Sequence, residues 1–342
     1  MVASIKQKAG KDFSPLDINL VSQPLKKQIP ADAYLVYKPT DILVDANGIQ
    51  QPDYEEIEQL KQYRFVIINC STEHWGEDFV PWFNQLIKPT GLKYIIISSN
   101  PADHLIEPNI IFYPYYYYGS IEVNRQTPLD EIKLERNYLL SSLNRVPRPH
   151  RILTYLTFNK KPYFDKCLFS LHAPFDEYSD PNALKLDADT LTEWDLLKDS
   201  LPKQRRVDLS SRDDAYTDSY INLITESNVA PGVYITEKTW KPVSVGQLFL
   251  LMGSPNSIAF LKDCGVDVYE DYIDHKYYDN EMVAETRVQK IFNLADSLVS
   301  KDLHKIYQET QARREKNIEN YFNGSFNNKY ADSLKLCINT LN

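Results

Sequence analysis

Short apolar runs alternate with segments of helical periodicity along most of this chain, and this alternation constrains the fold most strongly. Phe65–Asn69 and Tyr94–Ser98 are runs of the kind that form strands buried on both faces of a parallel sheet. Between them, Phe79, Phe83 and Ile87 fall on one face of a predicted helix. Parallel strands joined by helices are βα units, so the pattern predicts an α/β fold.

The βα pattern occurs in two series, which a charged, Pro-containing segment at Gln126–Asn137 separates. A chain of 342 residues is also longer than one compact core usually is. We therefore predict two facing Rossmann-like domains with parallel sheets and a ligand at the carboxyl ends of the strands. The predicted parts are 1–137, 138–325 and a C-terminal tail at 326–342 that packs back on the first domain.

Two elements late in the chain complete the prediction for the second domain. Val266–Tyr269 is a short apolar run, which indicates a further strand. Leu303–Tyr321 has helical periodicity and predicts one long helix that closes the domain.

Composition and charge narrow the function classes. A net charge of −9 argues against a large nucleic-acid-binding surface, although a basic stripe at Lys301–Lys316 leaves local contact open. The four cysteines lie far apart without CxxC or Cys/His spacing, which indicates free thiols in a reducing, cytoplasmic compartment. No run approaches the roughly 20 apolar residues that span a bilayer, so we expect no membrane span. The motifs of dehydrogenases, P-loop kinases and serine hydrolases are also absent from the sequence.

One strand-loop-helix junction concentrates residues that could hold a phosphorylated ligand. Ile221–Ile224 predicts a buried strand, Glu226–Gly232 a polar loop, and Thr236 the cap of a following helix. A helix N-terminus carries free N–H groups and partial positive charge, so Lys238 beside it indicates a pyrophosphate site. A carboxylate at Glu237 would repel phosphate, and we expect it to accept hydrogen bonds from ribose hydroxyls.

The whole segment Tyr220–Pro255 resembles the donor-binding motif of glycosyltransferase family 10, the fucosyltransferases. That motif reads strand, Glu-Asn-Ser, a short Gly-containing loop, Tyr-x-Thr-Glu-Lys, helix, strand, Gly-Ser-Pro. Here Glu226 occupies the acidic position and Ser227–Asn228 replaces Asn-Ser. Tyr234–Lys238 fits fully, and Gly253–Pro255 closes the pattern.

The resemblance implies the two-domain GT-B fold, with the donor in the C-terminal half and the acceptor in the N-terminal half. In the family the Tyr and Glu contact the nucleoside and the Lys contacts the phosphates, which implies these roles for Tyr234, Glu237 and Lys238. It also implies inverting transfer of fucose from GDP-fucose to a glycan hydroxyl, with no metal cofactor. Transfer of another sugar, onto modified nucleic acid for example, and a non-catalytic nucleotide-sugar-binding module stay open as alternatives.

A second basic turn precedes the first helix of the C-terminal half, at a location that suits an anion. Family members have an Asn after the equivalent strand and then an Arg that contacts the donor phosphates. Asn144 matches the Asn, and Arg151 matches the Arg best, with Arg145 and Arg148 as competing candidates. A solvated basic turn is the alternative.

Other residues allow two interpretations each. Glu226 is either a ligand-facing carboxylate or a structural acceptor for loop N–H groups. Tyr234 either stacks on a base or packs against the following helix. The Tyr113–Tyr118 run suits either sugar stacking or packing between domains.

The chain departs from the family pattern at the catalytic base. Inverting transfer needs a base that takes the proton of the acceptor hydroxyl. In the family this base is a Glu within a Gly-Glu-Asn stretch, but the corresponding strand and turn here, Ile95–Pro101, contain no Glu. We predict Glu73 as the base, with Asp103 as the second candidate. Each could instead be a helix-capping or surface acid.

Overall fold

The computed structural model describes residues 32–36, 38–46, 49–71, 78–126, 133–144, 146–171, 186–198, 214–326 and 337. The chain divides into two compact units, Met1–Glu122 with Asn327–Asn342, and Val123–Phe326. Each unit contains a parallel four-stranded sheet, so the predicted α/β fold with parallel sheets is confirmed. The domain bounds predicted at 137 and 325 stay a prediction.

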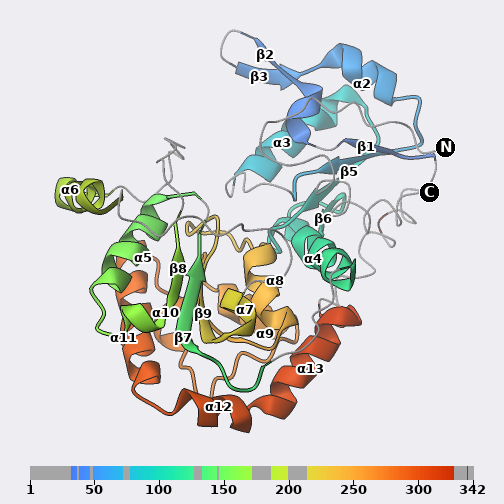
Figure 1. Cartoon of the computed structure of the whole chain (residues 1–342). Helices are drawn as coiled ribbons and strands as arrows, with labels where there is room; N and C mark the ends of the chain where they lie inside the picture. Colours follow the sequence, from blue (N-terminus) through green and yellow to red (C-terminus); the bar gives the residue numbers. More distant parts are fainter. Residues whose placement is uncertain are drawn as a thin grey trace. The chain divides into compact units, whose positions relative to one another are not determined.

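The first unit contains a parallel sheet in the strand order β1-β4-β5-β6 (Figure 1). Every residue of β4 and β5 is buried, as expected for strands covered on both faces. An antiparallel hairpin, β2-β3, accompanies the sheet. The strands are β1 (Tyr34–Val36), β2 (Leu43–Ala46), β3 (Ile49–Pro52), β4 (Val66–Asn69), β5 (Tyr94–Ser98) and β6 (Ile110–Phe112).

Helices cover this first sheet through apolar faces. Ile57 of α2 and Phe83 of α3 belong to one buried cluster together with Ile68 and Ile96 of the strands. Asp53 caps α2 by accepting a hydrogen bond from Glu56 N at 3.1 Å. The helices are η1 (Pro39–Ile42), α2 (Tyr54–Leu60), α3 (Phe79–Ile87), η2 (Lys88–Thr90), η3 (Asp103–Leu105) and α4 (Tyr115–Gln126), whose residues from Val123 on belong to the second unit.

The tyrosine run at Tyr113–Tyr118 leads into α4. The rings of Tyr113 and Tyr118 have centroids 5.5 Å apart, and those of Tyr117 and Tyr118 are 5.2 Å apart. Tyr116 and Tyr118 are half-buried, whereas the other tyrosines of the run are buried. Rings of the run thus contact one another, and both roles left open by the sequence, sugar stacking and packing between domains, stay predictions.

The second unit contains a parallel sheet in the order β10-β9-β7-β8, and β9 and β10 are buried throughout. Figure 1 shows α5 and α11 on one side of this sheet and α8 and α13 on the other. The strands are β7 (Tyr138–Leu143), β8 (Leu168–Ser170), β9 (Ser219–Thr225) and β10 (Leu248–Met252). The helices are α5 (Pro149–Asn159), η4 (Phe164–Lys166), α6 (Ala188–Leu197), α7 (Asp214–Thr217), α8 (Glu237–Ser244), α9 (Ser257–Asp263), α10 (Lys276–Asp279), α11 (Ala284–Val299), α12 (Leu303–Glu309) and α13 (Gln311–Phe322).

Two predicted elements of this unit are wrong. Val266–Tyr269 is not a strand, because Tyr269 has φ 60°. A side chain, and not a neighbouring strand, bonds to the backbone there. Asn317 Oδ1 accepts from Asp267 N at 3.0 Å in that segment. The single helix predicted over Leu303–Tyr321 is two helices, α12 and α13, which meet at Thr310.

Candidate functional site

The candidate site is the point in the second sheet where the strand order turns back. β7 pairs with β9 in the sheet, although β8 lies between them in the chain. Helices α5 and α8 begin after the carboxyl ends of these two strands. Ligands of open parallel sheets bind at this kind of switch point. Arg148 occupies the N-cap position of α5 without a capping hydrogen bond from its side chain, Arg151 lies in the first turn of α5, and Lys238 lies in the first turn of α8.

The start of α8 is encoded locally. Thr236 is the N-cap, and its Oγ1 accepts from Lys238 N at 3.4 Å. The helix ends in a Schellman motif, in which Gln247 N donates to Pro242 O at 2.8 Å and Gly246 N donates to Val243 O at 3.1 Å. These two caps fix which side chains α8 presents at the switch point.

Glu226 follows β9 and is completely buried, with an exposed fraction of 0%. Its Oε1 accepts from Thr236 N at 3.0 Å and from Thr239 Oγ1 at 2.6 Å. Its Oε2 accepts from Thr236 Oγ1 at 2.5 Å and from Ser227 N at 3.3 Å. These contacts are those of the structural acceptor, one of the two roles left open by the sequence. A contact with a ligand stays a prediction.

Arg151 reaches from α5 to the end of β9 and is only 3% exposed. Its Nη1 donates to Val146 O at 3.0 Å, and its Nη2 donates to Thr225 O at 3.3 Å and Glu226 O at 3.2 Å. Its Nε is buried without a hydrogen-bond partner. Burial, and then the charge of Arg148, lower the pKa of Arg151 to about 9, although nearby carboxylates act in the opposite direction. An anion bound beside Arg151 would offset the free-energy cost of burying its positive charge.

Arg148 and His150 flank Arg151. Arg148 is half-buried, and its Nη1 donates to Ser227 O. His150 is buried, and its Nε2 lies 2.9 Å from Glu226 O. Burial first, and then the charges of Arg151 and Arg148, lower the pKa of His150 well below 6.5. The imidazole is therefore neutral at pH 7, and its Nε2 carries the hydrogen because a carbonyl can only accept.

Lys238 lies where α8 meets the loop after β9. Its Nζ donates to Ser227 Oγ at 3.1 Å, Thr236 Oγ1 at 3.2 Å and Glu237 Oε1 at 2.9 Å. Burial raises the pKa of Glu237, but Lys238 and Lys241 outweigh it and lower that pKa to about 2. In the free protein the Glu237 carboxylate therefore accepts one of the Lys238 N–H hydrogen bonds that a phosphate would otherwise accept.

Arg151 and Lys238, which come from two helices, thus contact consecutive residues of one turn, Glu226 and Ser227. Two cations gathered at helix N-termini form an arrangement that suits a diphosphate. The donor-binding roles predicted for both residues stay predictions, and they rest on these contacts with neighbouring residues of one turn.

Tyr234 and Asn144, also predicted to bind the donor, are buried, with exposed fractions of 3% and 1%. Asn144 Nδ2 donates to Ser142 Oγ at 3.2 Å, and Asn144 Oδ1 accepts from Thr225 Oγ1. Asn144 therefore links β7 to β9. The donor contacts of both residues stay predictions.

Asp103, the second of the two predicted bases, belongs to the first unit. Asp103 is 4% exposed, and it accepts from Ser98 Oγ at 2.5 Å and from Asn100 Nδ2 at 2.9 Å. These bonds tie the end of β5 to the turn after it. Glu73 and Arg145 lie outside the described residues.

Sequence reasoning missed two structural residues of the site. Thr239 was not selected, although its position three residues after the N-cap is where side chains turn back toward a helix start. Arg287 lies on α11 and is 1% exposed. It donates to Glu281 O at 2.7 Å, Val229 O at 3.3 Å and Gly253 O, which joins the loops after β9 and β10. No local pattern in the sequence indicates a contact of this range.

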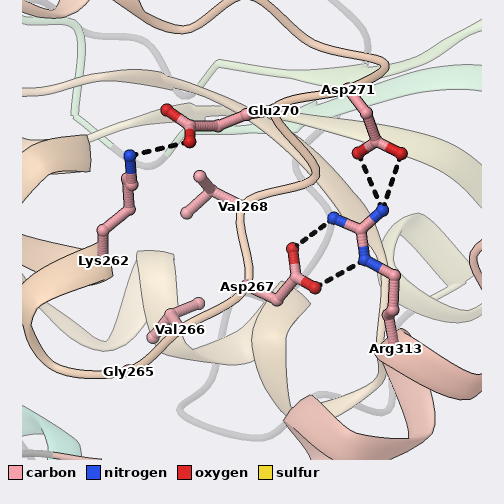
Figure 2. A pocket seen from close by; sticks show the side chains of 8 residues that line it. All are labelled: Lys262, Gly265, Val266, Asp267, Val268, Glu270, Asp271 and Arg313. Carbon is pink, nitrogen blue, oxygen red and sulfur yellow. Dashed lines mark hydrogen bonds and ion pairs between the residues drawn. The ribbon is translucent and has the colours of Figure 1, made fainter.

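A separate hollow lies on the surface of the second unit (Figure 2). Its cavity volume is about 470 Å³, and its lining residues are Lys262, Gly265, Val266, Asp267, Val268, Glu270, Asp271 and Arg313. Arg313 pairs with Asp267 at 2.6 Å and with Asp271 at 2.7 Å, and Lys262 pairs with Glu270 at 2.7 Å. Both cations of the hollow are paired with carboxylates, whereas Arg151 at the switch point donates to neutral carbonyl oxygens, so the hollow is the poorer anion site.

Within the described ranges, no group of three or more His, Cys, Asp or Glu side chains could hold a metal ion. None of the helices described is long and apolar enough to cross a membrane. The four cysteines, all among the described residues, form no disulfide bond with one another.

Comparison with known proteins yields one structural likeness. No protein-family model matches the chain, and no curated protein matches it. Among solved structures, the chain is similar to T4 phage BGT in complex with UDP and Mn²⁺. The sequence identity is 12% and the TM-score is 0.34, over 86% of this chain and 82% of that chain. A likeness at this level shows no family.

The same comparison corrects one expectation. We predicted a site without a metal and a donor linked to GDP, whereas the T4 phage protein is in complex with UDP and Mn²⁺. We therefore do not retain that expectation.

Proposed function

We propose that this protein is a glycosyltransferase that moves a sugar from a nucleoside-diphosphate donor to a hydroxyl acceptor. The observation that carries the proposal is the meeting of Arg151 and Lys238 at the Glu226–Ser227 turn. The turn lies at the switch point of a parallel sheet, where ligands of this fold class bind. The match of Tyr234–Lys238 to the Tyr-x-Thr-Glu-Lys motif supports the same conclusion.

The chemistry follows from the leaving group. The acceptor oxygen attacks the anomeric carbon, the bond from that carbon to the diphosphate oxygen breaks, and a base takes the hydroxyl proton. The departing diphosphate gains negative charge, which fixed cations stabilise most when they are already in place. Arg151, held by three carbonyl oxygens, and Lys238, held by Ser227 and Thr236, meet this requirement.

Finer features of the reaction belong to the proposal as well. The motif resemblance favours fucose as the sugar, a glycan hydroxyl as the acceptor and inversion at the anomeric carbon. Glu73 is the proposed base and Asp103 the second candidate. Tyr234 and Glu237 are proposed to contact the nucleoside, and the experiment below determines which nucleotide is bound.

A thermal-shift panel tests the proposal. GDP, UDP, their sugar conjugates and the nucleosides guanosine and uridine are added to the full chain, with Mn²⁺ or with EDTA. A ligand that binds only the folded state raises the Tm. We expect at least one nucleoside diphosphate to raise the Tm by several degrees, and its nucleoside to raise it less.

Two matched lysine variants make the panel specific. Lys238→Met removes the proposed phosphate contact, whereas Lys262→Met removes a lysine whose partner, Glu270, lies outside the switch point. We expect Lys262→Met to respond to the nucleotide like the wild type and Lys238→Met to respond much less. The proposal is wrong if no nucleotide shifts the wild type, or if both variants respond alike.

A further inference from the structure

A chain of hydrogen bonds runs from Glu226 through Thr236 to Lys238. Thr236 Oγ1 lies 2.5 Å from Glu226 Oε2. The same oxygen lies 3.2 Å from Lys238 Nζ and 3.4 Å from Lys238 N. Glu226 and Thr236 are buried, with exposed fractions of 0% and 1%, whereas 20% of the Lys238 side chain is exposed. The chain therefore leads from the interior to the edge of the proposed site.

The direction of every bond in this chain is fixed. Lys238 N and the Lys238 ammonium group can only donate, and they take both lone pairs of Thr236 Oγ1. The single hydroxyl hydrogen of Thr236 must therefore point to Glu226, which leaves its lone pairs for Lys238. While Glu226 accepts this hydrogen, the hydroxyl group of Thr236 keeps its orientation and its lone pairs stay directed at Lys238.

We infer that Glu226 is a positioning residue, which sets Lys238 for the diphosphate through the hydroxyl of Thr236 and without contact with the ligand. The inference rests on the proposed function. A lysine side chain has many rotamers, so a lysine that is already held in place loses less conformational entropy when the ligand binds. Glu226 also accepts from His150 and Arg151 through its carbonyl oxygen, so it joins the starts of α5 and α8.

Thr239 offers a matched comparison. Its Oγ1 donates to the other carboxylate oxygen of Glu226 at 2.6 Å, and its exposed fraction is 0%. Among the described residues, it forms no hydrogen bond with Lys238. Thr239→Val and Thr236→Val each remove one buried hydroxyl from the same carboxylate, but only the second interrupts the chain to Lys238.

The experiment measures the Kd of UDP, GDP, uridine and guanosine by titration calorimetry for the wild type and four variants. We expect Thr236→Val to weaken binding of the preferred nucleoside diphosphate about tenfold, as for the loss of one hydrogen bond to a charged group. Binding of the nucleoside should stay unchanged. Thr236→Ser keeps the hydroxyl and should restore wild-type affinity, and Thr239→Val should bind like the wild type.

Glu226→Gln tests the carboxylate itself. Either orientation of the new amide sets its NH₂ group against a backbone N–H, of Thr236 or of Ser227, so this variant could fail to fold. If it folds, it should lose affinity as Thr236→Val does. The threonine variants keep the inference testable if it does not.

The outcomes separate the inference from the proposed function. If the wild type binds a nucleoside diphosphate and Thr236→Val binds it equally well, the inference is wrong and the proposed function stands. If Thr236→Val and Thr239→Val lose the same affinity, or lose nucleoside binding too, Glu226 has only a general structural role. If the wild type binds no nucleotide, the proposed function is wrong and the inference falls with it.

Discussion

Nη2 of Arg151 lies 3.2 Å from the carbonyl oxygen of Glu226, so a helix of one βα unit holds the end of the neighbouring strand. The two residues are 75 positions apart in the chain. The contact brings the proposed phosphate-binding arginine to the same turn as Lys238. The interaction makes Arg151 part of the fold as well as a candidate ligand contact.

The first prediction concerns this double role. Arg151→Lys keeps the charge but loses the planar fork that reaches the carbonyl oxygens of Val146, Thr225 and Glu226. We expect the free energy of unfolding to fall by about 2–3 kcal/mol in the absence of ligand, because buried carbonyl groups lose their donors. Urea denaturation measures the change.

Arg313→Lys is the control for that measurement. Arg313 is partly exposed, and its partners are the carboxylates of Asp267 and Asp271. Exposed ion pairs contribute less than about 1 kcal/mol, so we expect a small effect. Equal losses in the two variants would show that the carbonyl contacts of Arg151 do not stabilise the fold.

The local features of the site could be predicted from the sequence. A short buried strand, a polar loop and a threonine cap follow one another within Ile221–Thr236, and each depends on neighbours in the chain. The structure contains β9, and α8 begins directly after its Thr236 cap. Parallel strands that are buried on both faces are mostly apolar, so both sheets could also be predicted from the sequence.

The long-range features could not be predicted in the same way. The role of Glu226 depends on Thr239, His150 and Arg151, which lie on two helices and meet only after the sheet has formed. The segment at Tyr269 is not a strand, and its partner is Asn317, 48 positions away from Tyr269. Asn317 accepts a hydrogen bond from Asp267 N and donates one to the hydroxyl group of Tyr269. Patterns of hydrophobicity contain no information on such partners.

The second prediction is a pH dependence that arises from Glu237. Its pKa is about 2 in the folded protein, against 4.5 ordinarily, because Lys238 and Lys241 outweigh the effect of burial. A lowered carboxyl pKa contributes stability that is complete above pH 4.5 and is lost as the pH falls toward 2. We expect the wild type to lose up to about 3 kcal/mol from this source across that window.

Acid titration of the unfolding free energy checks this contribution. Glu237→Gln should show a smaller loss between pH 4.5 and 2 than the wild type, because it has no carboxyl group to protonate there. Lys238→Met should also show a smaller loss, since it removes the nearest cause of the lowered pKa. Parallel curves for all three proteins would contradict the assignment.

The third prediction separates the two candidate bases. Both carboxylate oxygens of Asp103 accept buried or half-buried hydrogen bonds, from Ser98 and from Asn100. We expect Asp103→Asn to lower the free energy of unfolding by about 1–3 kcal/mol and to leave the rate of sugar transfer by the folded protein unchanged. Glu73→Gln should reduce that rate by about 100-fold or more, as for the loss of a general base. Full turnover in both variants would remove both residues as bases.

The fourth prediction concerns the turn that ends α8. Gly246 has φ 60°, a left-handed conformation that side chains adopt at a cost. A Cβ at this position would lie 3.0 Å from Arg314 Cβ and 3.0 Å from Ile318 Cδ1, on α13. Both the backbone and the close approach of α13 therefore require glycine there.

Gly91 allows the two causes to be separated. It also has a left-handed φ, of 72°, but a Cβ there would meet no atom within 4 Å. We expect Gly91→Ala to cost about 1 kcal/mol, from the backbone conformation alone. Gly246→Ala should cost about 2–4 kcal/mol, because overpacking against α13 adds to the backbone cost. Urea denaturation of both variants measures the difference. Equal losses in the free energy of unfolding would mean that α13 moves aside without cost and does not fix the position of α8.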